Sequence, residues 1–395
     1  MTATEVSTGS TPTTIAGLGA VSGYGWGRKL LWDGLYSAEP AARHLPGFSP
    51  AFDDDWGWVA RVEDGGDPAD GPSRFARALR FSAREAVHDA LDRGWRPGGV
   101  VGLLHSIVLG DVDHWRAYHH RHGDDTSRRG WLELMPSTVL TGVMQEFDFH
   151  GPAMAVSAMC ASSVSALLMA RLWIQAGLAS DVLMIATDLS TTPENCRSFA
   201  NLGPLVVDAH PFDACRPFQQ GSRGFSAGEA SVAMVLSGSP VPGHGVVLGG
   251  ACSHDAYHPV SIPADPTEVF RCFRAALDDA GCDPADISYL NAHGPGTAQC
   301  DTAEAAVFDE VLTGARGLFS VKPLVGHCQG ASGAIELCAS LFGFATGVIP
   351  APPRVAPGHP KLLDGPTAAE DGLVVKSSLG MGGHNAVVVV GASPN

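Results

Sequence analysis

Cys160 is the first residue whose type and position suggest chemistry. It lies in Ala155-Val-Ser-Ala-Met-Cys-Ala-Ser-Ser163, between a short apolar segment and a long helical pattern. A thiol at a helix N-terminus feels the positive end of the helix dipole, so we expect a lowered pKa and a nucleophilic thiolate. A tight strand-to-helix turn would expose the sulfur and let backbone N–H groups hold an oxyanion. A cysteine among small residues is more often simple packing, so this motif needs support from others.

Two histidines in the second half of the chain offer that support. His293 lies in Tyr289-Leu-Asn-Ala-His-Gly-Pro-Gly-Thr297, where the glycines allow a ligand or a second backbone to approach closely. His327 ends the segment Ser320-Val-Lys-Pro-Leu-Val-Gly-His327. Lys322 and Glu336 flank His327, so we expect Lys322 either to pair with Glu336 or to orient His327 electrostatically.

Two further motifs surround these histidines. Asp301 and Glu304 have the spacing of a helix capping box with Asp301 as the cap, which indicates a structural role. Ser377-Ser-Leu-Gly-Met-Gly-Gly-His-Asn385 is a glycine-rich turn between two apolar segments near the C-terminus. Each motif alone is a modest signal.

The elements that must position these residues follow an alternating pattern. Helical patterns cover Ser73–Gly94, Pro136–Phe147, Ala161–Ala176, Thr267–Ala280 and Ala331–Phe344. Buried strands are predicted at Thr14–Ala20, Val100–Leu104, Ala153–Ala158, Val182–Ala186, Val232–Leu236, Val246–Gly250, Ile287–Ala292, Gly372–Ser377 and Ala386–Val390. A Pro/Gly cluster at Ser239–Gly245 interrupts the pattern. We therefore predict an α/β protein with a disordered tail at 1–13, one half at 14–240 and a second at 245–395, without a visible sequence repeat.

Composition limits the classes of function. The chain has 395 residues, 45% of them hydrophobic, and a formal net charge of −16. Such a charge should repel nucleic acid and anionic membranes. We find no signal peptide and no run long enough to span a membrane. Nine cysteines without a C-x-x-C pair indicate neither a zinc knuckle nor a disulfide framework, and we expect a reducing cytoplasm.

Together the motifs resemble the β-ketoacyl synthase family of the thiolase superfamily, in its elongating Cys-His-His type. One cysteine, two histidines in glycine-rich loops and a terminal glycine-rich turn occur in the family's order and spacing. The resemblance covers nearly the whole chain. Further matching segments are Gly17-Leu-Gly-Ala20, Arg216-Pro-Phe218, Gly224-Phe225, Gly228-Glu229 and Asp255-Ala-Tyr-His258.

The resemblance implies a fold and an activity. The fold would be thiolase-like, with two similar α/β halves in a layered αβαβα arrangement. Cys160 would attack an acyl thioester, with the backbone N–H groups of Cys160 and Met381 as the oxyanion hole. His293 and His327 would assist malonyl decarboxylation and stabilise the enolate, in a decarboxylative Claisen condensation. Lys322 would belong to the catalytic group, supported by Glu336.

The resemblance also implies substrates and partners. Thr297, Ser261, Met381 and Gly382 would contact the pantetheine arm, which reaches the enzyme on an acyl carrier protein or on CoA. We expect no cofactor and no metal. The assembly would be a homodimer, or a heterodimer with a ketosynthase-like subunit, serving polyketide or fatty-acid-like specialised biosynthesis.

Departures from the family pattern concern the substrate. Pro295 replaces the first threonine of the usual His-Gly-Thr loop, and Met381 stands where the family commonly has a phenylalanine gate. Leu379 replaces a common aromatic residue, and Gln219 and Ser222 differ from the usual acidic and basic residues nearby. Because methionine is flexible, we expect the gate to adapt to a different acyl chain.

Carrier proteins are acidic, so an acidic enzyme needs a local basic surface. Arg74, Arg77, Arg80 and Arg84 share one helix face, and Arg128-Arg129 precedes Pro136. We predict carrier contacts at Arg74, Arg77, Arg128 and Arg129, with a solvated helix face as the alternative. The cluster of His114, His119, His120 and His122 lacks carboxylate or cysteine ligands placed for a closed metal site, and we interpret it as a surface or dimer-contact segment.

Two alternatives stay open beside condensation. A synthase-like acyltransferase would pass the acyl group from Cys160 to an amine or alcohol without losing CO₂. A non-catalytic partner resembling a chain-length factor is disfavoured because such partners typically lack the thiol.

Overall fold

The computed structural model of the chain describes residues 12–48, 56–120 and 128–394, without the side chains of Arg128 and Arg129. The predicted tail at 1–13 lies mostly outside these residues, and Thr13 already belongs to the first strand. None of the helices in the described ranges is long and apolar enough to cross a membrane.

The first half of the chain forms a five-stranded portion of one large sheet. Its order is β1-β9-β7-β5-β6, in which β1, β9 and β7 pair antiparallel and β7, β5 and β6 pair parallel. Every residue of β7 and β9 is buried, as expected for strands covered on both faces. The strands are β1 (Thr13–Ser22), β5 (Val101–Ser106), β6 (Ala153–Val156), β7 (Asp181–Asp188) and β9 (Ala230–Ser237).

The second half repeats this arrangement. Its order is β10-β16-β15-β11-β12, again with two antiparallel pairings followed by two parallel ones. Antiparallel pairing of β1 with β10 joins the two portions. The strands are β10 (Gly245–His254), β11 (Ile287–Asn291), β12 (Gly317–Phe319), β15 (Leu373–Gly380) and β16 (His384–Gly391). The halves are therefore structural duplicates.

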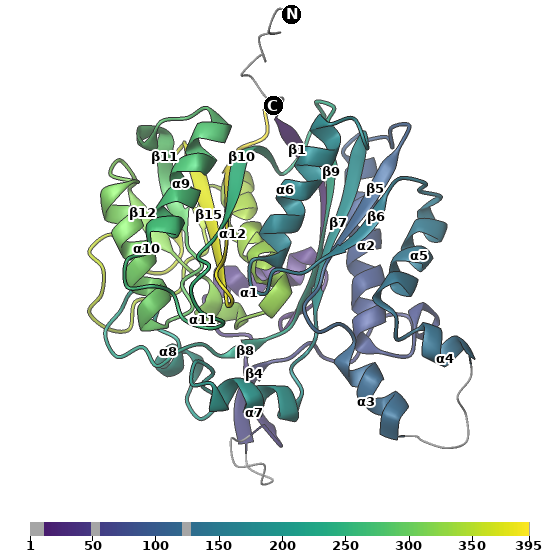
Figure 1. Cartoon of the computed structure of the whole chain (residues 1–395), viewed down its shortest axis with the longest axis horizontal. Coiled ribbons are helices and arrows are strands. Elements are labelled where there is room, and N and C mark those ends of the chain that lie inside the picture. The colour runs from purple at the N-terminus through teal and green to yellow at the C-terminus, as the bar shows by residue number, and fades with distance from the viewer. Residues whose placement is uncertain (1–11, 49–55, 121–127, 395) are drawn as a thin grey trace, which may run out of the picture.

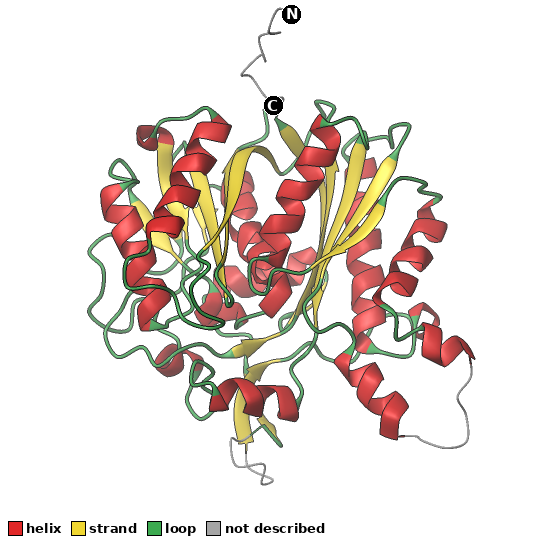
Figure 2. Cartoon of the chain, in the orientation of Figure 1, coloured by secondary structure: helices red, strands yellow, loops and turns green. Residues whose placement is uncertain are grey.

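Helices form three layers around these sheet portions (Figure 1). On one outer side, α2 (Arg74–Asp92) packs on β1, β7 and β9, and α5 (Pro136–Phe147) packs beside it. On the opposite side, α9 (Thr267–Ala280) covers β10 and β16, next to α10 (Ala298–Glu310). Between the halves, α6 (Ser162–Gln175) and α12 (Ser332–Thr346) contact strands of both. The predicted αβαβα layering is confirmed, as the alternation of helices and strands in Figure 2 shows.

The middle layer explains the composition of α12. Residues Ser332 to Gly343 are all buried because the helix is covered on every side. Small residues let it approach α6, since a Cβ on Gly333 would lie 2.6 Å from Val164 Cγ2. By contrast, α2 buries one face, including Phe75 and Leu79, and exposes the other.

Shorter elements complete the chain around the ends of the main strands. A small sheet has the order β3-β4-β8, and β13 pairs with β14. These elements are β2 (Gly25–Trp26), β3 (Arg43–Pro46), β4 (Trp56–Ala60), β8 (Ala227–Gly228), β13 (Val348–Ile349), β14 (Thr367–Ala368), α1 (Arg28–Ser37), α3 (Val112–His120), α4 (Arg128–Leu132), α7 (Pro193–Asn201), α8 (Pro211–Ala214), α11 (Lys322–Val325) and the 3₁₀ helices Pro68–Asp70, Pro284–Asp286 and Gln329–Ala331.

Candidate active site

Cys160 lies in a sharp turn between β6 and α6. Met159, directly before it, has a left-handed backbone with φ 49°, which is uncommon for a residue other than glycine. The following residues enter α6 at Ser162. The terminal glycine-rich turn presses against this elbow, because a Cβ on Gly380 would lie 2.7 Å from Ala158 O. The predicted strand-to-helix turn is thus present, and a second turn holds it in place.

His327 is in hydrogen-bonding contact with the thiol. Its Nε2 lies 3.1 Å from Cys160 Sγ. Its Nδ1 accepts the backbone N–H of Gln329 at 3.2 Å and lies 2.7 Å from Ser332 Oγ. Because a backbone N–H can only donate, the Nδ1 lone pair is occupied and the ring hydrogen lies on Nε2. His327 therefore presents an N–H donor to the sulfur.

His293 lies at the end of β11 and completes the group. Its ring centroid is 5.5 Å from that of His327. Its Nδ1 lies 3.2 Å from Lys322 Nζ, and a lysine ammonium can only donate. The hydrogen of His293 is therefore on Nε2 as well. The sulfur and one nitrogen of each ring lie within 4.8 Å of one another.

A buried ion network supports the His293 ring. Lys322 Nζ donates to the His293 carbonyl at 2.5 Å and pairs with Glu336, whose other oxygen lies 2.8 Å from Lys376 Nζ. All three side chains are fully buried. Burial lowers the pKa of Lys376, while the Glu336 carboxylate opposes that shift. The predicted pairing of Lys322 with Glu336 is present, but Lys322 contacts His293 rather than His327.

The protonation states differ from the sequence-based expectation for the thiol. Burial raises the pKa of Cys160 to about 11, although Lys322 and the donated N–H of Met381 act in the opposite direction. The expected low thiol pKa is therefore wrong, because desolvation outweighs the helix N-terminus. Burial, with the charge of Lys322 as a second cause, holds the pKa of His293 and of His327 well below the usual value. Both rings are neutral at physiological pH.

The acidic pair near His293 positions loops instead of capping a helix. Thr297 is the N-cap of α10, so the predicted cap at Asp301 is wrong. The Asp301 carboxylate accepts the N–H groups of Phe218 at 2.9 Å and Gly296 at 3.1 Å. Glu304 accepts the N–H of His293 at 2.8 Å. Glu304 also accepts the next N–H along the chain at 2.7 Å and a serine hydroxyl from β15 at 2.6 Å. The predicted structural role thus remains, by a different mechanism.

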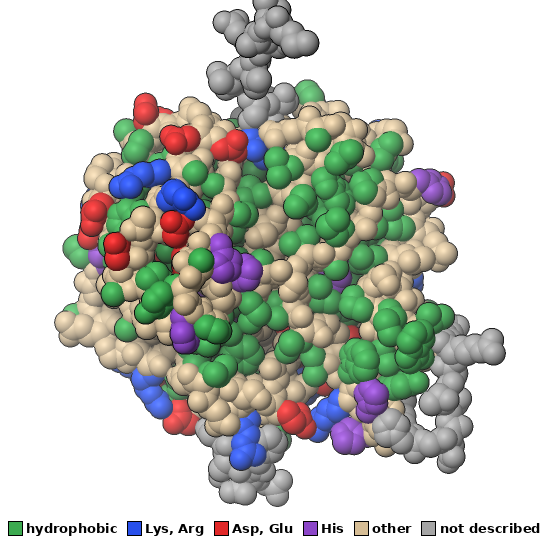
Figure 3. Space-filling model, viewed as in Figure 1, with side chains coloured by type: hydrophobic (Ala, Val, Ile, Leu, Met, Phe, Trp, Pro, Cys, Tyr) green, Lys and Arg blue, Asp and Glu red, His purple; other side chains and the backbone are tan. Residues whose placement is uncertain are grey.

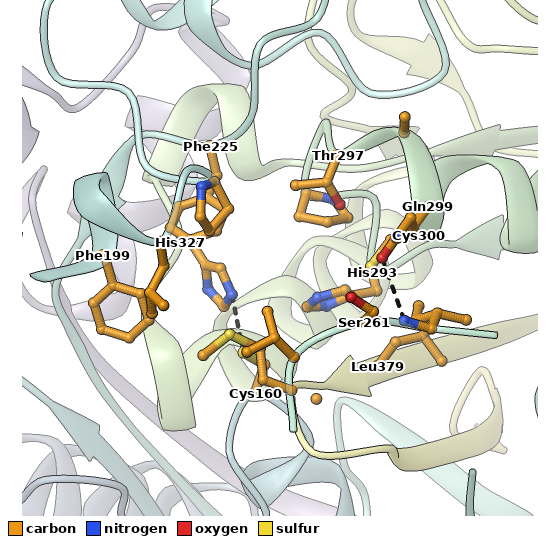
Figure 4. Close-up of a pocket in the computed structure, with 18 of the residues that line it drawn as sticks. Cys160, Phe199, Phe225, Ser261, His293, Thr297, Gln299, Cys300, His327 and Leu379 are labelled. Atoms are coloured by element: carbon orange, nitrogen blue, oxygen red, sulfur yellow. Dashed lines mark hydrogen bonds between the residues drawn. The ribbon is translucent and has the colours of Figure 1, made fainter. Parts of the chain in front are cut away.

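The three reactive groups open into a cavity of about 300 Å³ (Figure 4). Its wall includes Ser261, Thr297 and Met381, three of the four residues predicted to contact pantetheine. The fourth, Gly382, is not part of this wall, and Gly380 lines the cavity instead. Apolar wall residues include Phe199, Leu202, Phe225, Val260 and Leu379. The wall of the cavity is mostly apolar, and the reactive groups Cys160, His293 and His327 are part of it.

The three converging atoms do not have the donor set of a metal site. A zinc ion needs nitrogen lone pairs, whereas Nε2 of His293 and of His327 each carry a hydrogen. Those hydrogens follow from the donors that occupy each Nδ1. Neutral imidazole N–H groups facing a thiol instead suit the stabilisation of negative oxygen or sulfur.

On α2, the two arginines predicted to contact a carrier protein both form ion pairs within the chain. Arg74 is 12% exposed and pairs with Glu229 and Asp113 at 2.7 and 2.8 Å. Arg77 is similarly covered and pairs with Asp64 at 2.5 Å. The Arg74 pair with Glu229 is buried, whereas the Asp64 partner of Arg77 lies at the surface, so the docking prediction for these two residues stays a prediction.

The other predicted surface residues are only partly described. The side chains of Arg128 and Arg129 lie outside the described part of the chain, as does His122 of the histidine cluster. Within that cluster, His119 stacks on Trp115 with ring centroids 5.1 Å apart. The docking prediction for the two arginines therefore stays a prediction.

Sequence reasoning missed several residues of the site. Lys376 directly follows three apolar residues in the buried strand β15, and that contrast was a usable signal. Asp188, at the end of β7, accepts the Gly330 N–H at 3.3 Å and so holds the loop after His327. Gln329 has a left-handed backbone with φ 46° and lines the cavity. Nothing local distinguished Asp188 or Gln329.

Comparison with known proteins shows which family has this sequence and fold. The family described as "Beta-ketoacyl synthase, N-terminal domain" matches residues 11–239, and its C-terminal counterpart matches residues 244–355. A Streptomyces cyaneus protein named as a polyketide beta-ketoacyl synthase is 32% identical over 85% of this chain and 86% of its own length. The 3-oxoacyl-[acyl-carrier-protein] synthase 2 of Staphylococcus aureus strain COL is 29% identical over 95% and 97%.

Solved structures agree on the fold. A type II polyketide ketosynthase, in complex with its acyl-carrier protein and bound to a hexaketide, superposes with a TM-score of 0.84 at 23% identity, covering 97% of this chain and 99% of that one. An oxazolomycin ketosynthase domain of Streptomyces albus gives 0.81 at 22% identity, covering 98% and 75%. The chain is thus an acyl-transferring condensing enzyme of the thiolase-like fold. It belongs to the β-ketoacyl synthase family.

Proposed function

We propose that the chain lengthens an acyl group bound to Cys160 by decarboxylative Claisen condensation with a malonyl-type thioester. The contact of Cys160 Sγ with the Nε2–H of His327 at 3.1 Å, beside a second imidazole N–H from His293, carries this proposal. One nucleophile and two neutral donors line the same cavity, whose volume of about 300 Å³ can admit a pantetheine arm.

The first step is acyl transfer to Cys160. The sulfur attacks the thioester carbonyl, a carbon–sulfur bond forms, and the bond to the pantetheine sulfur breaks. The proton of Cys160 leaves with the departing pantetheine thiol. Because the thiol pKa is about 11, the thiolate needs local donors, and the N–H groups of Met381 and His327 supply them.

The second step generates the carbon nucleophile. A malonyl thioester enters with its carbonyl oxygen near Nε2 of His293 and His327. Loss of CO₂ leaves an enolate, and both N–H groups donate to its oxygen as charge develops. Lys322, paired with Glu336, keeps the His293 ring oriented, and burial together with the positive charge of Lys322 keeps both rings neutral.

The third step forms the carbon–carbon bond. The enolate carbon attacks the acyl-Cys160 carbonyl, whose oxygen is held by the backbone N–H groups of Cys160 and Met381. Collapse expels the Cys160 thiolate, which takes up one proton. The balance is acyl thioester plus malonyl thioester plus one proton, giving β-ketoacyl thioester, CO₂ and free pantetheine thiol.

The carrier of these thioesters is proposed to be an acyl carrier protein. The two named relatives from Staphylococcus and from the type II polyketide complex both refer to one. Ser261 and Thr297 are hydroxyl-bearing wall residues suited to the amide groups of a pantetheine arm. The pathway would be of the polyketide or fatty-acid type. All nine cysteines are free thiols, which supports a reducing, cytoplasmic location.

A homodimer is proposed from the exposed edge of β6. Within the described residues this strand pairs only with β5. Met154 on β6 is 49% exposed, and Leu172 on α6 is 54% exposed. Figure 3 shows hydrophobic side chains gathered over this side of the molecule, while charged side chains gather over the opposite half. An unpaired edge with apolar neighbours suits pairing with a second copy.

The decisive test uses acyl- and malonyl-thioesters on carrier protein. We expect CO₂ release in equal amount with a β-keto product. Acylated Cys160 without CO₂ release, together with acyl transfer to an added amine or alcohol, would instead establish the acyltransferase alternative. A matched Cys160→Ala variant should form neither acyl-enzyme nor product.

A further inference from the structure

A second, much smaller chamber adjoins the reactive groups. It has a volume of about 10 Å³, which is room for one water-sized group. It shares Phe199, His327 and Gln329 with the main cavity, so the two spaces meet beside the ring that contacts Cys160. In the proposed mechanism the pantetheine arm occupies the main cavity, and the chamber lies against His327, whose Nε2 is 3.1 Å from Cys160 Sγ.

The wall of the chamber is unusually polar for the end of an acyl site. Ser190, Thr191, Asn195 and Gln329 all line it. The side-chain amide nitrogen of Asn195 already donates a hydrogen bond to the Ser190 carbonyl at 2.8 Å. The remaining polar groups therefore decide what the chamber can bind.

Two of these side chains are buried without hydrogen-bond partners. Thr191 is 5% exposed, and its Oγ1 contacts no partner within the described residues. Gln329 is 8% exposed, and none of the hydrogen bonds found among those residues involves its side-chain amide. Buried polar groups in folded proteins are normally paired, so the buried, unpaired Thr191 hydroxyl indicates a missing ligand atom, and the Gln329 amide on the same wall can bind that atom as well.

The backbone keeps Gln329 in this position. Its own N–H donates to His327 Nδ1 at 3.2 Å, and the next N–H, from Gly330, donates to Asp188 at 3.3 Å. A Cβ on Gly330 would lie 2.9 Å from Val108 Cγ2, so the loop cannot shift outward freely. The left-handed φ of 46° at Gln329 is maintained by these contacts.

We propose that Gln329 and Thr191 determine acyl specificity by hydrogen bonding to a keto or hydroxyl oxygen on the acyl chain, close to its thioester. This inference rests on the proposed acyl-Cys160 intermediate. The Gln329 carboxamide and the Thr191 hydroxyl can each donate or accept, so both kinds of oxygen fit. A plain hydrocarbon chain would leave both groups buried and unpaired, which disfavours it.

The test compares acyl groups that differ by one oxygen. Acylation of Cys160 is followed by intact-protein mass spectrometry with butyryl, 3-hydroxybutyryl and 3-oxobutyryl N-acetylcysteamine thioesters. Wild type should favour the oxygenated groups. Gln329→Met, which keeps the side-chain volume, should reduce that preference by about tenfold, and Thr191→Val by a smaller factor. For each thioester, the acylation rate of the variant is divided by that of wild type, so that differences in the intrinsic reactivity of the thioesters cancel.

Gln299→Leu is the matched control. Gln299 lines the main cavity but not the small chamber, and its amide oxygen accepts the Ile262 N–H at 3.3 Å. This variant should change acylation by all three thioesters by the same factor. If Gln329→Met and Thr191→Val also leave the preference unchanged while Cys160 is still acylated, a bound water satisfies the chamber and the inference is overturned, with the proposed function intact. Failure of every thioester to acylate wild type would overturn both.

Discussion

The two halves of the molecule share one strand order but make different contributions to the site. The first half delivers a single covalent group, Cys160, from the turn between β6 and α6. The second half delivers the electrostatic groups: His293 after β11, His327 after α11, and the Met381 N–H between β15 and β16. A duplicated scaffold has thus been divided between bond formation and charge stabilisation.

The electrostatics of the two halves differ accordingly. Around Cys160 the main effect is desolvation, which raises the thiol pKa. Around the histidines, fully buried charges of both signs lie within hydrogen-bonding distance of one another. The comparison shows that groups from the second half activate the nucleophile of the first half. Removing Cys160 should therefore stop acylation, whereas removing a histidine should slow decarboxylation.

Cys160→Ala should have the largest effect on condensation. It should abolish acyl-enzyme formation, the contribution of the first half, and leave the histidines of the second half in place. Without a sulfur no acyl-enzyme forms, and we expect condensation to fall by roughly 10⁴-fold or more. Slow CO₂ release from malonyl thioester should continue, because His293 and His327 are untouched. Radiolabelled CO₂ and product are measured in parallel. Undiminished product would contradict the assignment of Cys160 as the residue that carries the acyl group.

His293→Ala should remove one donor of the second half. We expect CO₂ release and condensation to fall by about 10²- to 10³-fold, the usual loss for one donor to a developing oxyanion. Acylation of Cys160 should change far less, since His293 does not contact the sulfur in the way that His327 does. Single-turnover acylation and CO₂ release are compared. Equal losses in both steps would contradict the assignment.

The reactivity of Cys160 should rise steeply with pH. Because burial raises the thiol pKa to about 11, the thiolate fraction grows by about tenfold per pH unit up to that value. Alkylation by iodoacetamide, followed by mass spectrometry at Cys160, should therefore show no plateau between pH 7 and pH 10. A plateau near pH 7 would show that the second half lowers the thiol pKa more than burial raises it.

The decarboxylation step should be the least sensitive to pH. The pKa of each histidine lies well below its usual value, so both rings stay neutral as pH falls from 8 to 6. We expect the rate of CO₂ release to change by less than about twofold over this range. Measurements on pre-acylated enzyme isolate this step. A loss centred near pH 6.5 would mean that a ring titrates normally.

Much of the fold follows from sequence patterns. The Pro136–Phe147 helical pattern corresponds to α5, and the buried strand at Thr14–Ala20 lies within β1. Apolar periodicity reports such elements because each buries its own face. The structural duplication of the two halves was not visible in the sequence. Two segments can adopt the same strand order when they share a pattern of apolar and polar residues, even if their side chains differ.

Burial was the hardest property to infer. The spacing of the arginines on α2 predicts a shared helix face, but it did not predict that Arg74 pairs with the buried Glu229. Sequence spacing predicts which residues share a helix face, but it does not predict which acidic residues from distant segments form ion pairs with them. Those partners lie on separate elements of the fold.

The sequence by itself determined the reactive residue types, their order, and the elements that carry them. Only the tertiary structure decided that Cys160 and His327, 167 positions apart, lie 3.1 Å from each other. It also decided that Lys322 serves His293, that the thiol is protonated at rest, and that Gln329 and Thr191 face one small chamber. The physical reason is that proximity and desolvation arise when distant segments pack together, and no local pattern encodes that packing.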